Sequence, residues 1–343
     1  MIQLFKRPFV RSVERDNLLE VFLVTAVSSV LCIRFFLAVT GYPQLSGRGL
    51  HVAHVLVGGV FMMVALVILL AYINKSAFYV GAVLGGFGFG AFIDEVGKFI
   101  TQDNNYFFQP AVALIYVAFI LIYLTKEVIC RGPVLSEHEK LINVLEITKE
   151  AVLNDMDSQE RKRALELVGN CSASQPVARV LKELLYGIDS VPVPEPGVYA
   201  RIKNYARSFY DRMVRKKWFV NVVIVFFVLQ SIFTLIVSSM VLILLVMAGG
   251  DGMPILHFSD VGGLVASAAA AILVAAGVMK IRKRRLVAYN YFRNAILVQI
   301  LLVQVFVFYK EQLAALTSLA VNIVVLLVLR YMISQEDVSQ ICR

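Results

Sequence analysis

The stretch Gly85–Pro110 reads GGFGFGAFIDEVGKFITQDNNYFFQP. Its apolar, glycine-rich part is followed by two adjacent acids, Asp94 and Glu95, and by Lys98. A second stretch, Arg48–Gly59, reads RGLHVAHVLVGG and opens another apolar run with two histidines. Ionisable groups inside membrane helices are costly, so they mark functional sites by default. We therefore expect the chemistry of this protein to lie where these two stretches meet.

The composition is typical of a membrane protein. Of 343 residues, 59% are hydrophobic and 17% are charged, and the mean hydropathy is +0.76, whereas about a quarter of the residues in soluble domains are charged. The formal net charge of +9 comes from basic residues that flank apolar segments, such as Lys280–Arg285. This placement orients a membrane protein and attracts anionic lipid, so we expect a lipid bilayer as partner and no nucleic acid.

Eight apolar runs have about the 20 residues that a membrane-spanning helix needs. The sequence thus predicts an all-α polytopic membrane helical bundle with about eight transmembrane helices. The runs are Leu18–Thr40, Leu50–Ile73, Phe78–Ile100, Phe107–Leu124, Trp218–Met247, Ile255–Met279, Leu286–Tyr309 and Leu313–Ile333. The predicted domains are a basic N-terminus (1–17), a first four-helix half (18–129), a helical insert with its linker (130–217), a second four-helix half (218–333) and a tail (334–343).

Basic residues predict the orientation, because they collect in cytoplasmic loops. With eight spans, the basic N-terminus, Lys75, the region Lys126–Lys217 and Lys280–Arg285 all fall on one side. We expect both termini and the insert to be cytoplasmic, and the two polar stretches to face outward.

The insert has the pattern of a small helical module. Ser136 with Glu139 and Asp157 with Glu160 are capping-box patterns that start two helices, and a third helix is expected over Pro176–Gly187. A last helix, after the proline-rich linker VPVPEPG, is expected to continue into the fifth apolar run. No catalytic constellation is visible, so we expect a packing module or a docking site for a protein partner. The four cysteines, none in a CxxC pair, predict free thiols; they are Cys32, Cys130, Cys171 and Cys342.

Six ionisable residues fall at a similar depth near the outer ends of the first three runs. His51 and His54 are three residues apart and would share a helix face, whereas Asp94 and Lys98 are four apart and can pair. Glu95 points about 100° away from Asp94, so the two acids are expected to take different neighbours. The full set is Arg34, His51, His54, Asp94, Glu95 and Lys98, with Asp103 in the adjoining loop.

Small residues explain how the helices that carry these groups can approach one another. Gly81, Gly85, Gly86 and Gly90 on the third run, with Gly58 and Gly59 on the second, form small-residue patches, which permit close helix contact in lipid. The segment GFGFG lacks the GxGxxG spacing and the preceding strand of a nucleotide loop. The glycines therefore predict close packing.

Three interpretations of the polar cluster stay open. His51 and His54 with Asp94 or Glu95 would suit a divalent metal ion in a membrane-embedded hydrolase, although the two bases already balance the two acids. Alternatively, the cluster handles a small ion, proton or solute, since histidine changes charge near neutral pH. In the third interpretation, the protein is structural or scaffolding, and the ion pairs of the cluster only hold the helices in register. The second, ion- or proton-linked transport or sensing, is the working hypothesis.

The second half of the chain contains a pattern similar to that of residues 51–59. HFSDVGG, residues 257–263, resembles HVAHVLVGG, so His257 and Asp260 would correspond to His51 and His54 in a duplicated chain. Parallel repeats of this kind occur in transporters. The seventh run has no counterpart of the DEVGK segment, so a second complete site is not expected.

The segment GYPQLSGRGLHVAHVLVGG, residues 41–59, together with residues 85–110, resembles a family of uncharacterised bacterial integral membrane proteins. The resemblance covers mainly the first four apolar runs and implies no activity. It implies a multi-pass protein of the bacterial cytoplasmic (inner) membrane.

Overall fold

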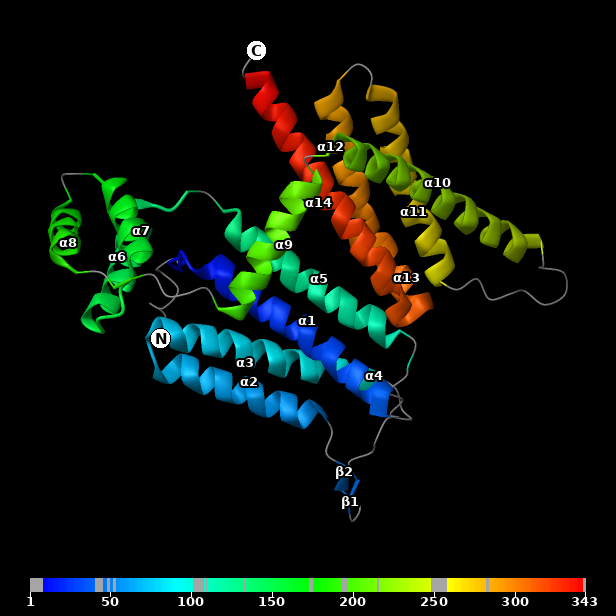
Figure 1. The fold of residues 1–343 in the computed structure, drawn as a ribbon. Coiled ribbons are helices and arrows are strands. Elements are labelled where there is room, and N and C mark those ends of the chain that lie inside the picture. The colour runs from blue at the N-terminus through cyan, green and yellow to red at the C-terminus, as the bar shows by residue number, and fades with distance from the viewer. Residues whose placement is uncertain are drawn as a thin grey trace, which may run out of the picture. The chain divides into compact units, whose positions relative to one another are not determined.

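A computed structural model of the chain is built almost entirely from helices (Figure 1). It describes residues 9–40, 46–47, 50–51, 54–100, 108, 110–132, 134–172, 175–189, 191–192, 197–214, 216–247, 258–281 and 284–341. Within these residues the one sheet is a hairpin of two short strands, β1 (Ser46–Gly47) and β2 (Leu50–His51). The predicted all-α class is confirmed.

The helices form two compact units, which are described separately. Unit 1 comprises Met1–Phe99 and Leu121–Pro196, and unit 2 comprises Ile100–Ile120 and Gly197–Arg343. The helix α5 (Ala111–Cys130) therefore contributes its first half to unit 2 and its second half to unit 1.

Three long apolar helices form the membrane part of unit 1. They are α1 (Arg15–Thr40), α2 (His54–Ala71) and α3 (Lys75–Asp94), and the short helix α4 (Val96–Ile100) follows. Helix α3 packs along both α1 and α2, and its antiparallel pairing with α2 is visible in Figure 1. The second span begins at His54, not at the predicted Leu50, because residues 50–51 belong to β2.

Glycines let α3 lie closer to its neighbours than other residues would allow. A Cβ atom added at Gly90 would lie 2.3 Å from the carbonyl oxygen of Ala26 in α1, and one at Gly86 would lie 2.4 Å from another α1 carbonyl. Gly58 of α2 and Gly88 face each other, so a Cβ on either would lie 2.6 Å from the other's carbonyl oxygen. Neither contact tolerates a side chain without moving backbone.

The predicted close-packing role is thus confirmed at Gly58, Gly86 and Gly90, but it does not hold at every glycine. A Cβ at Gly59 would meet no atom within 4 Å, and one at Gly85 would make only ordinary contacts, the nearest at 3.6 Å. The sequence pattern identifies the interface helix but not which of its glycines face a neighbour.

A three-helix bundle completes unit 1. It contains α6 (Glu137–Val152), α7 (Ser158–Gly169) and α8 (Pro176–Gly187). Both predicted capping boxes are confirmed, because Ser136 and Asp157 each accept a backbone N–H bond while the glutamate three residues on reaches back. The bundle has its own apolar core, made of Leu141, Val144, Met156, Ala164, Val168, Ala178, Leu181 and Leu185.

Unit 2 contains the remaining long helices. They are α9 (Val198–Val214), α10 (Lys217–Met247), α11 (Phe258–Lys280), α12 (Arg285–Val298), the π-helical turn η1 (Gln299–Val303), α13 (Gln304–Glu311), the 3-10 turn η2 (Gln312–Ala314) and α14 (Ala315–Ile341). The expected continuation of α9 into the fifth run is wrong. Turn hydrogen bonds at Lys216 close α9 before α10 begins.

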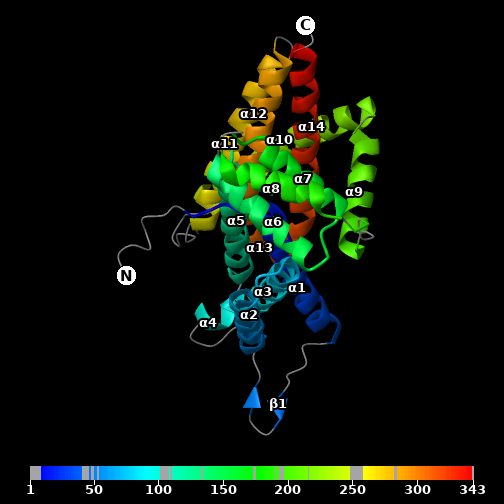
Figure 2. The ribbon, with the colours of Figure 1, turned by 90° about the vertical axis from the view of Figure 1, so that its left-hand side faces the viewer.

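Six helical stretches in the described residues are long and apolar enough to cross a membrane. One of them, residues 285–334, holds both the predicted seventh and eighth runs. Gln312, whose φ is 52°, reverses the chain there. Phe292 and Ile296 of α12 consequently pack against Val325 and Leu329 of α14, and Figure 2 shows these helices side by side.

Uncharged amides are buried between the helices of unit 2. Gln304 Nε2 donates to the carbonyl of Ala315 at 2.8 Å and to Ser318 Oγ at 2.9 Å. Gln299 Nε2, at the start of η1, donates to Ser231 Oγ at 2.9 Å. Such bonds between membrane helices contribute modestly, on average about 0.6 kcal/mol each. They fix the register of α10, α13 and α14.

Candidate functional site

Two consecutive acids at the end of α3 form the centre of the predicted cluster. Asp94 and Glu95 are both wholly buried. Helix α3 ends at Asp94, and Glu95, with φ −89° and ψ 9°, leaves the helical path before α4 begins. The break lets the neighbouring carboxylates bind partners on different helices.

Asp94 is paired with α1. Its Oδ1 lies 2.5 Å from Arg34 Nε, and the side chains are largely buried on both sides. A buried ion pair is costly to form and more costly to break, because removal of one partner leaves an uncompensated charge. This pair therefore fixes the position of α3 against α1.

Glu95 is bound to α2 and α4. Its Oε1 lies 2.7 Å from Lys98 Nζ and 3.3 Å from His54 Nδ1, while its Oε2 accepts the backbone N–H of Val55 at 2.9 Å. The last bond satisfies one of the donors that the first turn of a helix leaves open. Glu95 thus caps α2 from a neighbouring helix, beside a histidine that is 35% exposed.

The structure brings five of the predicted site residues together: Arg34, His54, Asp94, Glu95 and Lys98. The prediction that His51 shares a helix face with His54 is wrong, because His51 lies in β2, before the helix begins. Helical spacing does not apply to a residue that lies in a strand.

Three predicted residues remain. Asp103 and His257 are outside the described residues. Asp260 lies in the first turn of α11, in unit 2, and its Oδ1 lies 2.6 Å from Lys310 Nζ of α13. The similar segment in the second half of the chain therefore contributes Asp260 to a separate ion pair.

The metal interpretation receives no ligand set from the described residues. No group of three or more His, Cys, Asp and Glu side chains there could hold a metal ion. Around Glu95, the position that a cation would take is held by the ammonium of Lys98. Three cysteines, Cys32, Cys130 and Cys171, form no disulfide, as predicted; Cys342 lies outside the described residues.

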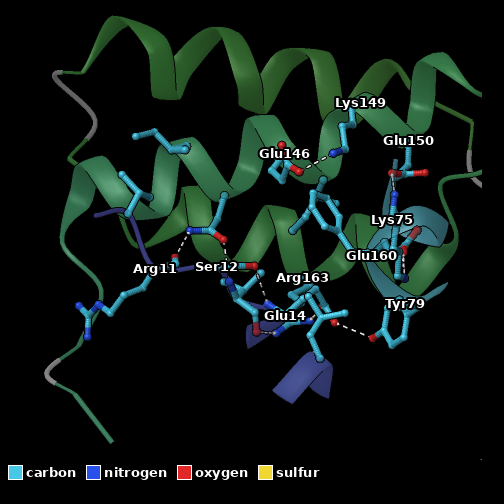
Figure 3. Close-up of a pocket in the computed structure, with 17 residues that line it drawn as sticks. Arg11, Ser12, Glu14, Lys75, Tyr79, Glu146, Lys149, Glu150, Glu160 and Arg163 are labelled. Carbon is cyan, nitrogen blue, oxygen red and sulfur yellow. Dashed lines mark hydrogen bonds and ion pairs between the residues drawn. The ribbon is translucent and has the colours of Figure 1, made fainter. Parts of the chain in front are cut away.

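A second candidate site, which sequence reasoning missed, is a cavity of about 300 Å³ in unit 1 (Figure 3). It lies between the segment that precedes α1, the start of α3, and helices α6 and α7. Glu14 pairs with Arg163 and accepts a bond from Tyr79 Oη at 3.1 Å, and Lys75 pairs with Glu160. The charged side chains pair with one another, and apolar side chains line the rest of the cavity. Lys75, the first residue of α3, was the available signal, because the charged insert offers it acidic partners such as Glu160.

The segment before α1 closes one side of this cavity by lying on α6. Asn143 Oδ1 accepts the Val13 N–H at 2.7 Å, and Asn143 Nδ2 donates to the Arg11 carbonyl at 2.8 Å. Arg11 Nε lies 2.8 Å from Glu139 Oε1. The Arg11 guanidinium, with the backbone N–H of Ser136, holds the pKa of Glu139 below its usual range.

Glu14, on the same segment, has competing influences. Burial alone would raise its pKa, but a hydrogen bond from Asn17 and the charge of Arg163 outweigh it, and the pKa of Glu14 is lowered. Glu14 of the segment and Glu139 of α6 are therefore both ionised at neutral pH, and their ion pairs bind the segment to the bundle.

Comparison of the chain with protein-family models, curated proteins and solved structures finds no match.

Proposed function

We propose that this chain is an eight-span protein of the bacterial cytoplasmic membrane that senses protons, or links a proton or small ion to transport, at its outer ion-pair cluster. The observation that carries the proposal is the bridge from His54 to Glu95 to Lys98. It sets a partly exposed histidine against a wholly buried carboxylate, at the junction of two membrane helices.

The bridge supplies a way for a proton to act on helix packing. Protonation of His54 places a positive charge 3.3 Å from Glu95 and turns a hydrogen bond into a charge-assisted one. Histidine is the side chain that changes charge between about pH 5 and 8. The junction of α2 and α3 should therefore tighten at mildly acidic external pH and loosen as the pH rises.

Contacts within unit 1 support the expected orientation. Lys149 of α6 binds the carbonyl of Ile73 in the connection between α2 and α3, and Lys75 pairs with Glu160 of α7. The N-terminal segment reaches the same bundle through Arg11. These contacts support a topology in which the N-terminus, this connection and the insert share the cytoplasmic side, with the His54 cluster at the opposite ends of the helices.

A test of the proposal is His54→Gln, which keeps a hydrogen-bonding side chain but cannot take up a proton. The matched control is His138→Gln on α6, outside the cluster. Wild type and control in lipid nanodiscs should melt at higher temperature at pH 5.5 than at pH 8 because of His54, whereas His54→Gln should lose most of that difference. In proteoliposomes with an internal pH dye, any proton flux should be lost in His54→Gln alone.

A second candidate, a purely structural cluster, is favoured by the burial of both carboxylates and by their ion pairs to other helices. If His54→Gln keeps the wild-type pH dependence and Asp94→Asn fails to fold, the cluster only positions helices. Under that outcome the sensing and transport proposal is wrong.

A further inference from the structure

Helix α9 exposes an apolar stripe. At 100° per residue, Ile202, Tyr205 and Phe209 fall within about 60° of the helix circumference. Their exposed fractions are 63%, 70% and 53%. A row of three large, exposed apolar side chains is typical of a surface that binds a partner.

Basic residues lie along one edge of the stripe and on the polar face of the helix. On the helical projection Arg201 and Arg212 lie within about 40° of one edge, whereas Lys203 lies about 100° and Arg207 about 140° beyond the other edge, and all four are exposed. The helix has no acid before Asp211. An apolar row with arginines along one edge and further cations on the polar face matches a helix that lies in the membrane surface, with its apolar face among acyl chains.

A tertiary contact sets α9 at the corresponding depth. Tyr210 Oη donates to the carbonyl oxygen of Leu327 in α14 at 2.6 Å. Leu327 is seven residues before Ser334, where the apolar stretch of α12 to α14 ends, so it lies about 10 Å inside that end at 1.5 Å per residue. Amphipathic interfacial helices bury their apolar face about 5–10 Å into the headgroup and acyl boundary. The exposed Trp218, at the start of α10, fits the same level.

We propose that α9 is an interfacial helix that binds anionic phospholipid: Ile202, Tyr205 and Phe209 insert between acyl chains, and Arg201 and Arg212, along the edge of the stripe, bind headgroup phosphates. The partner is the bilayer surface and not a second protein, because Tyr210 binds α14 about 10 Å inside the end of its apolar stretch and the apolar helix α10 begins three residues after α9 ends. This surface is distinct from the outer cluster, which lies in unit 1.

The test uses the full-length protein in bilayer nanodiscs with one tryptophan as reporter. Trp218 is the chain's one tryptophan, so Trp218→Phe combined with Tyr205→Trp places the reporter on the stripe. The matched control is Trp218→Phe with Asn204→Trp, on the polar side. Lipids brominated in the acyl chain should quench the reporter at 205, and iodide in water should quench the one at 204. Phe209→Trp in the same background repeats the test if the first variant folds poorly.

Headgroup selectivity is read with the same reporter at 205. Brominated phosphatidylglycerol should quench it at lower mole fraction than brominated phosphatidylcholine. Arg201→Gln with Arg212→Gln should reduce that preference, roughly five-fold for each charge removed. Arg179→Gln with Lys182→Gln on α8 removes the same charge and should leave it unchanged. Iodide quenching at 205, or equal quenching by the two lipids, would overturn the proposal.

Discussion

The adjacent acids of α3 show how much one residue step changes the partner of a side chain. Asp94 ends the helix and pairs with Arg34 on α1, whereas Glu95 leaves the helical path and binds His54 and Lys98. Two like charges side by side would repel if they shared a pocket. Separation onto different helices gives each carboxylate its own cation and joins α1, α2 and α4 to the end of α3.

Loss of the buried pair of Arg34 with Asp94 should lower the free energy of unfolding more than loss of an exposed ion pair. Asp94→Asn leaves the guanidinium of Arg34 without its carboxylate, which should lower the free energy of unfolding by about 3–5 kcal/mol. Lys310→Gln breaks the more exposed pair with Asp260 and should cost about 0–1 kcal/mol. Both can be measured by denaturant unfolding in detergent micelles.

The double variant Arg34→Leu with Asp94→Leu provides the internal control for this comparison. Because it removes both charges, it should be closer to wild type than either single change. A loss for Asp94→Asn no larger than that for Lys310→Gln would contradict the assignment of a buried pair.

At the scale of elements, the contact of α3 with α1 and α2 depends on backbone approaching backbone. The glycines permit it, and a serine adds to it, since Ser29 Oγ of α1 donates to the carbonyl of Phe87 at 3.0 Å. Dispersion over closely packed surfaces is the main attraction between helices in lipid. The loss of stability on substituting a glycine therefore depends on whether that glycine faces the backbone of a neighbouring helix.

Gly90→Ala and Gly59→Ala form a matched pair for this point. The first places a methyl group 2.3 Å from a carbonyl of α1, and the second places it in open space. Gly90→Ala should cost about 1–3 kcal/mol through overpacking, whereas Gly59→Ala should be neutral or slightly stabilising. Thermal unfolding in the same detergent separates them. Equal melting temperatures would mean that α3 does not pack on α1 through Gly90.

At the scale of the whole molecule, unit 1 joins membrane helices to a helical bundle through a short segment that precedes α1. Arg11, Val13 and Glu14 bind α6 and α7 by side-chain and backbone contacts. Unit 2 carries the amphipathic α9, which binds α14 through Tyr210 and the carbonyl of Leu327. Each unit thus couples its long apolar helices to a more polar element, and the two couplings differ in chemistry.

The attachment of the N-terminal segment should weaken in acid. The folded-state pKa of Glu139 and Glu14 is lowered, so their stabilisation is present at neutral pH and is lost as the pH falls from their usual value, about 4.3, toward the lower folded-state value. Hydrogen exchange at the Arg11 and Val13 amides, corrected for intrinsic rates, should lose protection over that window.

Glu139→Gln should reproduce that loss of protection at pH 7. The control is Glu146→Gln, which breaks the exposed pair with Lys149 on the same helix and should have little effect. Full protection in Glu139→Gln would show that Asn143 and the pair of Glu14 with Arg163 hold the segment without Glu139.

The sequence by itself determined the membrane class, the helical fold, the caps at Ser136 and Asp157, and the presence of acids and bases near one end of the first three helices. These follow from run length, composition and short-range patterns. Only the tertiary structure decided that Asp94 binds Arg34, that Glu95 caps α2, that His51 lies in a strand, and that the N-terminal segment lies on α6. The physical reason is that α1, α2 and α3 are apolar around nearly their whole circumference, so no amphipathic face fixes their rotation, and rotation decides which charges meet.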